Sequence, residues 1–168
     1  FDHFMLKEIF EQPEAVKNAL RGRILEGEGV SRLGGLDQVI DRLKNIKRIH
    51  FVSCGTSYYA GLLARYVFEK LTDFRVEVEY ASEFRYRSLR LNEEIAVVAI
   101  SQSGETADTL AAVREARRKG ALCLGLVNVV GSTISKETDA GVYNHAGPEI
   151  GVASTKAFLS QPVILCLM

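Results

Sequence analysis

The chain has 168 residues, a formal net charge of zero and a hydrophobic fraction of 47%. At roughly 100–200 residues per domain, this length is enough for one domain. The composition excludes disordered and collagen-like proteins, and neutrality argues against a broad surface for nucleic acid or membrane. A small anion site built from backbone amides stays compatible with neutrality, because such a site adds no charge.

The N-terminal part of the chain has a helical pattern. Residues 2–20 carry apolar side chains at helical spacing, and Pro13 divides them into two short helices or one kinked helix. The glycine-rich stretch 21–35 is predicted to be a connecting loop, and residues 36–45 an amphipathic helix. Together these segments predict an N-terminal helical region over residues 1–45.

From residue 46 to residue 168, short apolar segments alternate with helical patterns. The expected strands are 49–52, 75–80, 95–100, 122–127 and 140–143. The second of them alternates apolar and charged residues, as a half-exposed edge strand does. The sequence therefore predicts an α/β fold: a three-layer sandwich with a five-stranded parallel sheet flanked by helices, doubly wound and flavodoxin-like.

Helices are expected between these strands, at 56–71 and 105–119. A last helix should start near Ser154, and Pro162 should break or kink it. The last apolar run ends at Met168 without a helix stop signal, so we expect the C-terminal helix to be cut short and the chain to be part of something larger.

Cysteine and histidine spacings indicate neither disulfides nor a metal. The cysteines lie beside apolar residues and are Cys54, Cys123 and Cys166. We predict reduced thiols in a cytoplasmic protein. The histidines are far apart and lack metal-ligand spacing, so we expect no metal and no cofactor. The longest apolar run is far short of the roughly 20 residues that cross a bilayer, so we expect no membrane contact.

Two predicted strands run into short hydroxyl-rich turns followed by helices. One turn is Ser53–Ser57 and the other is Ser101–Thr106. Ligands of open parallel sheets bind beyond the carboxyl ends of the strands, where helix N-termini offer free N–H groups to anions. The second turn is therefore a candidate phosphate site made without lysine or arginine. Two points count against it: Ser103 could instead cap the helix, and Glu105 repels phosphate unless it points away.

A third polar stretch, residues 147–156, could close over a ligand or be an ordinary loop. The P-loop, dinucleotide and hydrolase-elbow motifs are absent. A receiver or flavin module of similar strand order is disfavoured, since a receiver needs an acidic pocket at the strand ends and this chain has Ser53 and Ser101 there.

Five segments of the chain resemble the isomerase half of the glutamine–fructose-6-phosphate aminotransferase family. The segments are Phe4–Pro13, Cys54–Tyr58, Ala81–Phe84, Ser101–Leu110 and Gly147–Lys156. The Ser-Gln-Ser-Gly-Glu-Thr motif alone indicates only the wider sugar-isomerase (SIS) family. The first and last segments narrow the resemblance to the aminotransferase family. It covers essentially the whole chain, in order.

The resemblance implies a first SIS domain that binds fructose 6-phosphate. It implies that the phosphate is held by Ser101, Gln102, Ser103 and Thr106. It further implies that the sugar is lined by Thr56, Ser57, Val152 and Ser154. The family converts fructose 6-phosphate and glutamine to glucosamine 6-phosphate and is expected to be dimeric.

The same resemblance implies that this chain holds no catalytic residue. The family's isomerisation base, Schiff-base lysine and ring-opening histidine lie in a second SIS domain, so Glu149, Lys156 and His145 receive no catalytic role. The chain alone is expected to bind sugar phosphate without turnover, with the remaining domains of the synthase as partners. The alternative function is a non-catalytic SIS module that senses a sugar phosphate.

Overall fold

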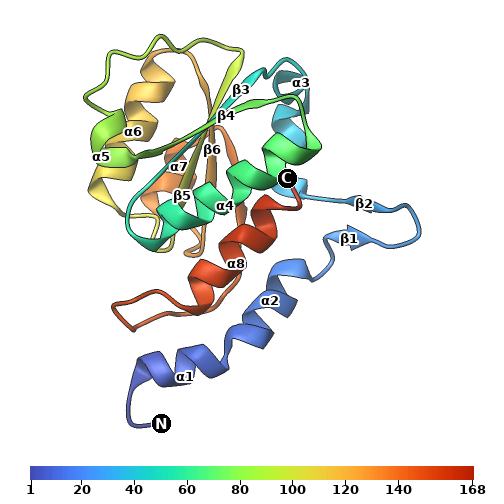
Figure 1. The fold of residues 1–168 in the computed structure, drawn as a ribbon, viewed down its shortest axis with the longest axis vertical. Coiled ribbons are helices and arrows are strands. Elements are labelled where there is room, and N and C mark those ends of the chain that lie inside the picture. The colour runs from blue at the N-terminus through green and yellow to red at the C-terminus, as the bar shows by residue number, and fades with distance from the viewer.

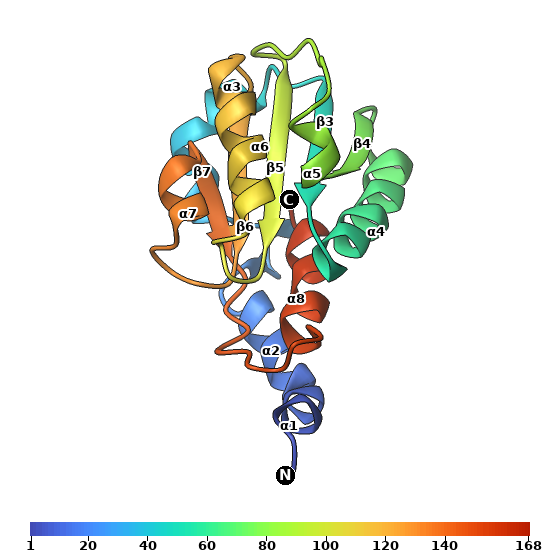
Figure 2. The same ribbon diagram turned by 90° about the vertical axis from the view of Figure 1, so that its left-hand side faces the viewer.

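The computed structural model describes residues 1–168 and has a five-stranded parallel sheet covered on both faces by helices (Figures 1 and 2). Its strands are β3 (Arg48–Ser53), β4 (Arg75–Tyr80), β5 (Ile95–Ser101), β6 (Leu122–Val127) and β7 (Ala140–Tyr143). They lie in the order β4-β3-β5-β6-β7, and every neighbouring pair is parallel. The predicted three-layer α/β fold is confirmed.

Burial along the strands follows their positions in the sheet. Every residue of β5 and β6 is buried, as expected for central strands of a parallel sheet with both faces covered. Strand β4 lies at one edge, and only Val76 is buried in it. The alternating sequence of β4 therefore correctly indicated an edge strand.

The helices form two layers with separate apolar cores. They are η1 (Gly34–Val39, a 3-10 helix), α3 (Ile40–Leu43), α4 (Thr56–Leu71), α5 (Ala81–Phe84), α6 (Ala107–Arg118), α7 (Thr133–Glu137) and α8 (Lys156–Leu165). Helices α4 and α8 pack with η1 on one sheet face, and α5, α6 and α7 pack on the other (Figure 1). None of the helices combines the length and the apolar character that crossing a bilayer would require.

The N-terminal region contains two short helices, α1 (Phe4–Phe10) and α2 (Gln12–Leu20). Pro13 lies in the first turn of α2, where a missing N–H costs nothing, so the predicted interruption at this proline is confirmed. Helix α2 lies beside α8, and α1 extends away from the sheet (Figures 1 and 2).

Two N-terminal predictions need correction. The stretch 21–35 contains a small antiparallel hairpin, β1 (Ile24–Leu25) with β2 (Val30–Ser31), because the glycines there form the turn between two short extended segments. Residues 36–45 do not form one amphipathic helix; they are divided between η1 and the single turn α3. The tighter 3-10 geometry begins where the backbone of Gly35 lies against the carbonyl of Gly141.

Helix α8 begins at Lys156, two residues after the predicted start, and contains Pro162 without being ended by it. The proline removes the hydrogen bond to the carbonyl of Phe158, but the next turn forms, since Cys166 N–H donates to the carbonyl of Pro162 (2.9 Å). Ile164 and Leu165 are buried in the main core. This burial of apolar surface offsets the lost hydrogen bond, so Pro162 does not break the helix, which was one of its two predicted effects.

We expect the thiols to differ sharply in reactivity. Burial raises the pKa of Cys123 to about 12, whereas Cys166 is exposed. Because the thiolate is the nucleophile, iodoacetamide at pH 8 should alkylate Cys166 and leave Cys123 unmodified until the protein unfolds. Peptide mass spectrometry of native and urea-unfolded samples measures this. Equal labelling of both thiols in the native protein would contradict the burial of Cys123.

The strand order indicates where a ligand is expected to bind. If the five strands are numbered in chain order, their order across the sheet is 2-1-3-4-5. The second strand is added on one side of the first and the later strands on the other, so the switch point of the sheet lies between β3 and β5. Helix α4, which follows β3, packs on one face, and α6, which follows β5, packs on the other. The turns after these strands, residues 53–57 and 101–106, therefore lie where open parallel sheets of this kind bind their ligands.

Candidate functional site

The turn after β5 is held in shape by its own hydroxyl groups. The Ser101 side chain is buried, and its Oγ accepts a hydrogen bond from the N–H of Gly104 (3.0 Å). The same oxygen lies 3.2 Å from Oγ1 of Thr106. Oγ of Ser103 accepts from the N–H of Glu105 (3.1 Å). The turn therefore adopts a defined curved conformation within residues 101–106.

This conformation leaves donors available to a ligand. The backbone N–H groups of Gln102, Ser103 and Thr106 make no hydrogen bond within the chain. Helix α6 begins at Ala107, and the N–H groups of its first turn are free as well. Ser103 bonds inside the turn instead of capping α6, so the capping alternative is not what the structure shows. Several donors and a helix dipole meet in one turn, which suits a phosphate.

Glu105 points away from this turn, which removes the objection that it would repel an anion. Its Oε1 accepts a hydrogen bond from the N–H of Thr133 (2.7 Å), at the start of α7. The hydrogen bonds to Thr133 lower the pKa of the Glu105 carboxyl. The carbonyl of Gly104 accepts from Ile134 N–H (3.0 Å), so α7 supports the turn at two points.

The turn after β3 leads into α4 through Gly55, which has a positive φ of 59°. Thr56 and Ser57 are the first two residues of α4, and Ser57 is buried. Nε2 of Gln161 donates to Oγ of Ser57 (3.0 Å). Because this oxygen accepts from Gln161, the Ser57 hydroxyl is free to donate to another group. Gln161 on α8, which the sequence analysis missed, is therefore a residue that orients Ser57.

The stretch before α8 is organised by Glu149. Its Oε2 accepts from the Ser154 hydroxyl (2.8 Å), and its Oε1 accepts from the N–H of Thr155 (2.8 Å). Ser154 Oγ also accepts from Phe158 N–H (3.1 Å), so it satisfies one of the free N–H groups in the first turn of α8. Val152 is fully exposed. No hydrogen bond joins residues 152 or 154 to the turn at 101–106, so the structure does not bring all predicted site residues together.

Asn128, at the carboxyl end of β6, connects two of these segments and was also missed. Its N–H donates to the carbonyl of Gln102 (3.2 Å). Its Nδ2 donates to the carbonyl of Gly147 (2.7 Å), and its Oδ1 accepts from Ala146 N–H (2.8 Å). An amide side chain directly after a buried strand was the signal that could have found it.

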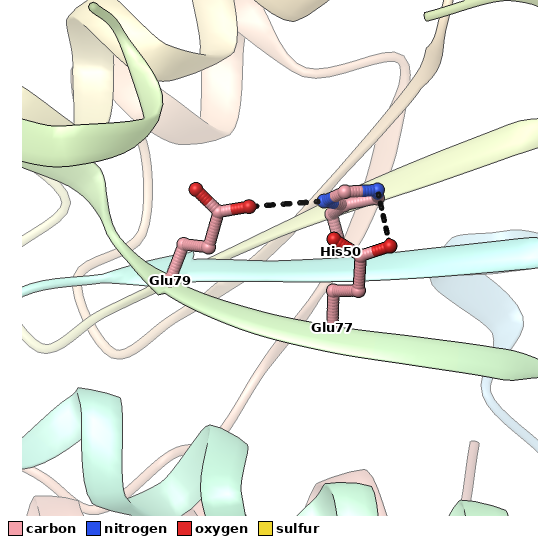
Figure 3. Close-up of side chains that lie close together, drawn as sticks. All are labelled: His50, Glu77 and Glu79. Atoms are coloured by element: carbon pink, nitrogen blue, oxygen red, sulfur yellow. Dashed lines mark ion pairs between the residues drawn. The ribbon is translucent and has the colours of Figure 1, made fainter. Parts of the chain in front are cut away.

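The sequence suggested that His50 is isolated from other metal-binding side chains, but the structure places two carboxylates beside it. It lies on β3 between two glutamates of β4, with Nε2 3.9 Å from Glu77 and Nδ1 3.7 Å from Glu79 (Figure 3). A histidine nitrogen and one oxygen of each carboxylate lie within 4.8 Å of one another, a grouping that could hold a cation. Arg87 pairs with Glu79 and Arg75 lies 3.6 Å from Glu77. These arginines already balance the carboxylates, so we assign no metal here.

Acidification is expected to destabilise the protein through His50. Burial lowers the pKa of its imidazole below the usual 6.5, outweighing the opposite effect of Glu77 and Glu79. Below pH 6.5 the unfolded chain binds a proton at this residue and the folded chain does not, so the free energy of unfolding falls until the lowered pKa is passed. One proton gives a slope of at most about 1.4 kcal/mol per pH unit.

Urea unfolding of wild type and His50→Gln between about pH 7.5 and 5 measures this contribution. The wild type should lose more stability on acidification than the variant, which lacks the titrating ring. Equal pH slopes for the two proteins would show that His50 is not the group responsible.

A flavodoxin-like strand order with a hydroxyl-rich turn at its switch point defines a class of α/β domain. Residues 42–168 match the SIS domain family, and the chain belongs to that family. Within it, the chain matches the SIS region of glutamine–fructose-6-phosphate aminotransferases. It is 56% identical over 168 residues to the enzyme of that name from Chlorobaculum tepidum and 50% identical over 167 residues to the Rattus norvegicus enzyme 1.

A solved structure supports the same assignment. The C-terminal domain of glucosamine-fructose-6-phosphate aminotransferase from Francisella tularensis matches with a TM-score of 0.91 and 42% identity, over 99% of this chain and 46% of that one. The two sequence matches include 100% and 99% of this chain, but they cover only 27% and 24% of the relatives' lengths. It therefore spans about a quarter of the relatives that it matches.

Proposed function

We propose that this SIS domain binds a phosphorylated ketohexose, fructose 6-phosphate, beyond the carboxyl ends of β3 and β5. The observation that carries the proposal is the turn at 101–106, where backbone N–H groups without partners lie beside hydroxyls at the start of α6. A phosphate dianion is stabilised by such donors and by the helix dipole without a cationic side chain. A formal net charge of zero agrees with a site of this kind.

The predicted residues divide into two groups in this proposal. Ser101, Gln102, Ser103 and Thr106 hold the phosphate, Ser101 mainly by shaping the turn. The sugar hydroxyls are bound by residues that come from two other segments, Thr56, Ser57, Val152 and Ser154. The oriented Ser57 hydroxyl supports its part in this set, since its O–H is free to donate.

The intact protein is proposed to be a glutamine–fructose-6-phosphate aminotransferase that makes glucosamine 6-phosphate. This rests on relatives of that name, of which the chain covers about a quarter. Neither Glu149, whose carboxylate accepts hydrogen bonds from Ser154 and Thr155, nor Lys156, which pairs with Glu11 (2.6 Å), is available for catalysis in this arrangement. We therefore propose that this domain supplies binding without turnover, and that the other domains and a second protomer complete the enzyme.

Removing one hydroxyl from the turn should weaken binding of fructose 6-phosphate. Ser103→Ala or Thr106→Ala should each cost about 1–2 kcal/mol, the size of a hydrogen bond to a charged group. Calorimetric titration of the intact protein measures the affinity. Ser88→Ala, which removes an exposed hydroxyl from the segment after α5, is the matched control and should bind as wild type does. Unchanged affinity in both turn variants would reject the phosphate site.

The alternative, a non-catalytic sensor of sugar phosphates, shares the binding site but not the chemistry. An assay for glucosamine 6-phosphate formed from fructose 6-phosphate and glutamine separates the two functions. Binding without product formation by the intact protein would favour the sensor.

A further inference from the structure

Helix α1 buries a carboxylate and exposes its apolar side chains. Glu8 is 2% exposed and is the only buried residue of the helix, whereas Phe4 is 58% and Phe10 is 66% exposed. Burying a carboxylate costs free energy unless hydrogen bonds compensate, and burying phenylalanine would have been favourable. The position of α1 is therefore explained by the contacts of Glu8 and not by hydrophobic packing.

Glu8 accepts hydrogen bonds from two successive backbone amides of the segment before α8. Its Oε1 lies 2.6 Å from the nitrogen of Ile150 and 3.2 Å from that of Gly151, and its Oε2 lies 3.1 Å from the nitrogen of Gly151. A Cβ on Gly151 would lie 2.6 Å from Glu8 Oε2. The carboxylate thus approaches the backbone at a point that only glycine leaves open.

These bonds fix one end of a short exposed stretch whose other end is fixed independently. On one side, Glu8 holds Ile150 and Gly151. On the other side, Glu149 holds Ser154 and the N–H of Thr155. Only residues 152 and 153 lie between, and both are exposed. The position of Val152 is therefore set by two carboxylates, Glu8 from α1 and Glu149 from the segment itself.

A second contact joins the same parts of the chain. Lys156, at the first position of α8, is 5% exposed, and its Nζ lies 2.6 Å from Oε2 of Glu11. Glu11 also pairs with Lys7 (2.8 Å). The N-terminal helices are thus attached to both the segment before α8 and its first residue.

We propose that Glu8 is a positioning residue that holds residues 150–154 in the conformation that binds the sugar part of the ligand. The inference rests on the proposed function, which gives Val152 and Ser154 that role. It makes α1 part of the ligand site, although α1 lies outside the residues 42–168 that match the SIS family. Glu8 does not touch the phosphate turn, whose hydrogen bonds involve other residues.

The test compares Glu8→Ala with wild type in the intact protein, with two ligands. Affinity for fructose 6-phosphate should fall about tenfold, as expected for lost hydrogen bonds to a charged group, while affinity for inorganic phosphate stays unchanged. Hydrogen exchange at Ile150 and Gly151 should accelerate by about tenfold or more. Glu8→Gln keeps one acceptor oxygen, so its affinity for fructose 6-phosphate should lie between those of wild type and Glu8→Ala. The control is Glu14→Gln on α2, an exposed glutamate that pairs only with Lys17 and Arg21.

The outcomes separate this inference from the proposed function. Equal weakening of both ligands in Glu8→Ala would indicate a general structural role and overturn the inference. Unchanged exchange at residues 150–151, or unchanged sugar-phosphate affinity, would overturn it too while leaving the proposed function intact. A wild-type protein that binds neither ligand would reject the proposed function, and with it the role of Glu8 in sugar binding.

Discussion

Gly104→Ala is expected to abolish measurable binding of fructose 6-phosphate and to destabilise the protein by about 2–4 kcal/mol. Gly104 has a φ of 68°, and a Cβ there would lie 2.1 Å from Oγ and 2.5 Å from Cβ of the buried Ser132. The added carbon must push away either Ser132 or the turn. Since the free N–H groups of Gln102 and Ser103 belong to that turn, its displacement removes the proposed phosphate donors.

The control is a glycine that also has a positive φ but has open space around its Cα. Gly120 has a φ of 88°, and a methyl group added there would have no atom within 4 Å. It follows α6 at the end of that helix opposite the proposed site. Gly120→Ala should therefore lose about 1 kcal/mol and keep full ligand affinity. Calorimetric titration and urea unfolding of both variants measure the difference. If Gly104→Ala bound as tightly as Gly120→Ala, the turn would not be the phosphate site.

Gly35→Ala is expected to destabilise the fold by about 3–5 kcal/mol. A Cβ at Gly35 would lie 2.0 Å from the carbonyl oxygen of Gly141 on β7, and this atom cannot move without disturbing the sheet. Gly125 on β6 is paired with Gly141, so side chains are missing where η1 approaches the sheet. The substitution must lift η1 from the sheet and open the core around Leu36 and Val39.

The preceding glycine provides a stringent control for this prediction. Gly34 begins the same 3-10 helix, and the nearest atom to an added Cβ is Oδ2 of Asp37 at 3.8 Å, an ordinary contact. Gly34→Ala should leave stability within about 1 kcal/mol of wild type or raise it, because alanine loses less backbone entropy on folding. Urea unfolding measures both variants. Similar stabilities for the two would contradict the close approach of η1 to β7.

Much of the fold could be predicted because it depends on local patterns. Buried parallel strands are continuously apolar, and β5 and β6 could be identified from that property alone. Pro13 marked the boundary between α1 and α2, since a proline is tolerated best in the first turn of a helix. The short elements were missed: α5 and α7 have four and five residues, too few to show helical periodicity.

The proposed phosphate turn could be identified for a related reason. Its residues are consecutive, and the glycine, hydroxyls and helix start that shape it are visible in the order of the chain. The sequence also showed that such a turn is compatible with a net charge of zero, because backbone amides carry no charge. Sequence alone therefore determined the α/β class and the alternation of layers, and it predicted the turn that we propose as the phosphate site.

Tertiary structure decided what depends on residues that are distant in the chain. Glu105 turns toward α7 through a bond to Thr133, 28 residues away, which no local pattern indicates. Glu8 binds Gly151 across 143 residues, and His50 meets its glutamates only because β3 pairs with β4 in one register. Composition shows neither which buried charge is compensated nor which glycine faces a neighbouring backbone. Those properties arise from packing, where a shift of about an ångström decides between contact and clash.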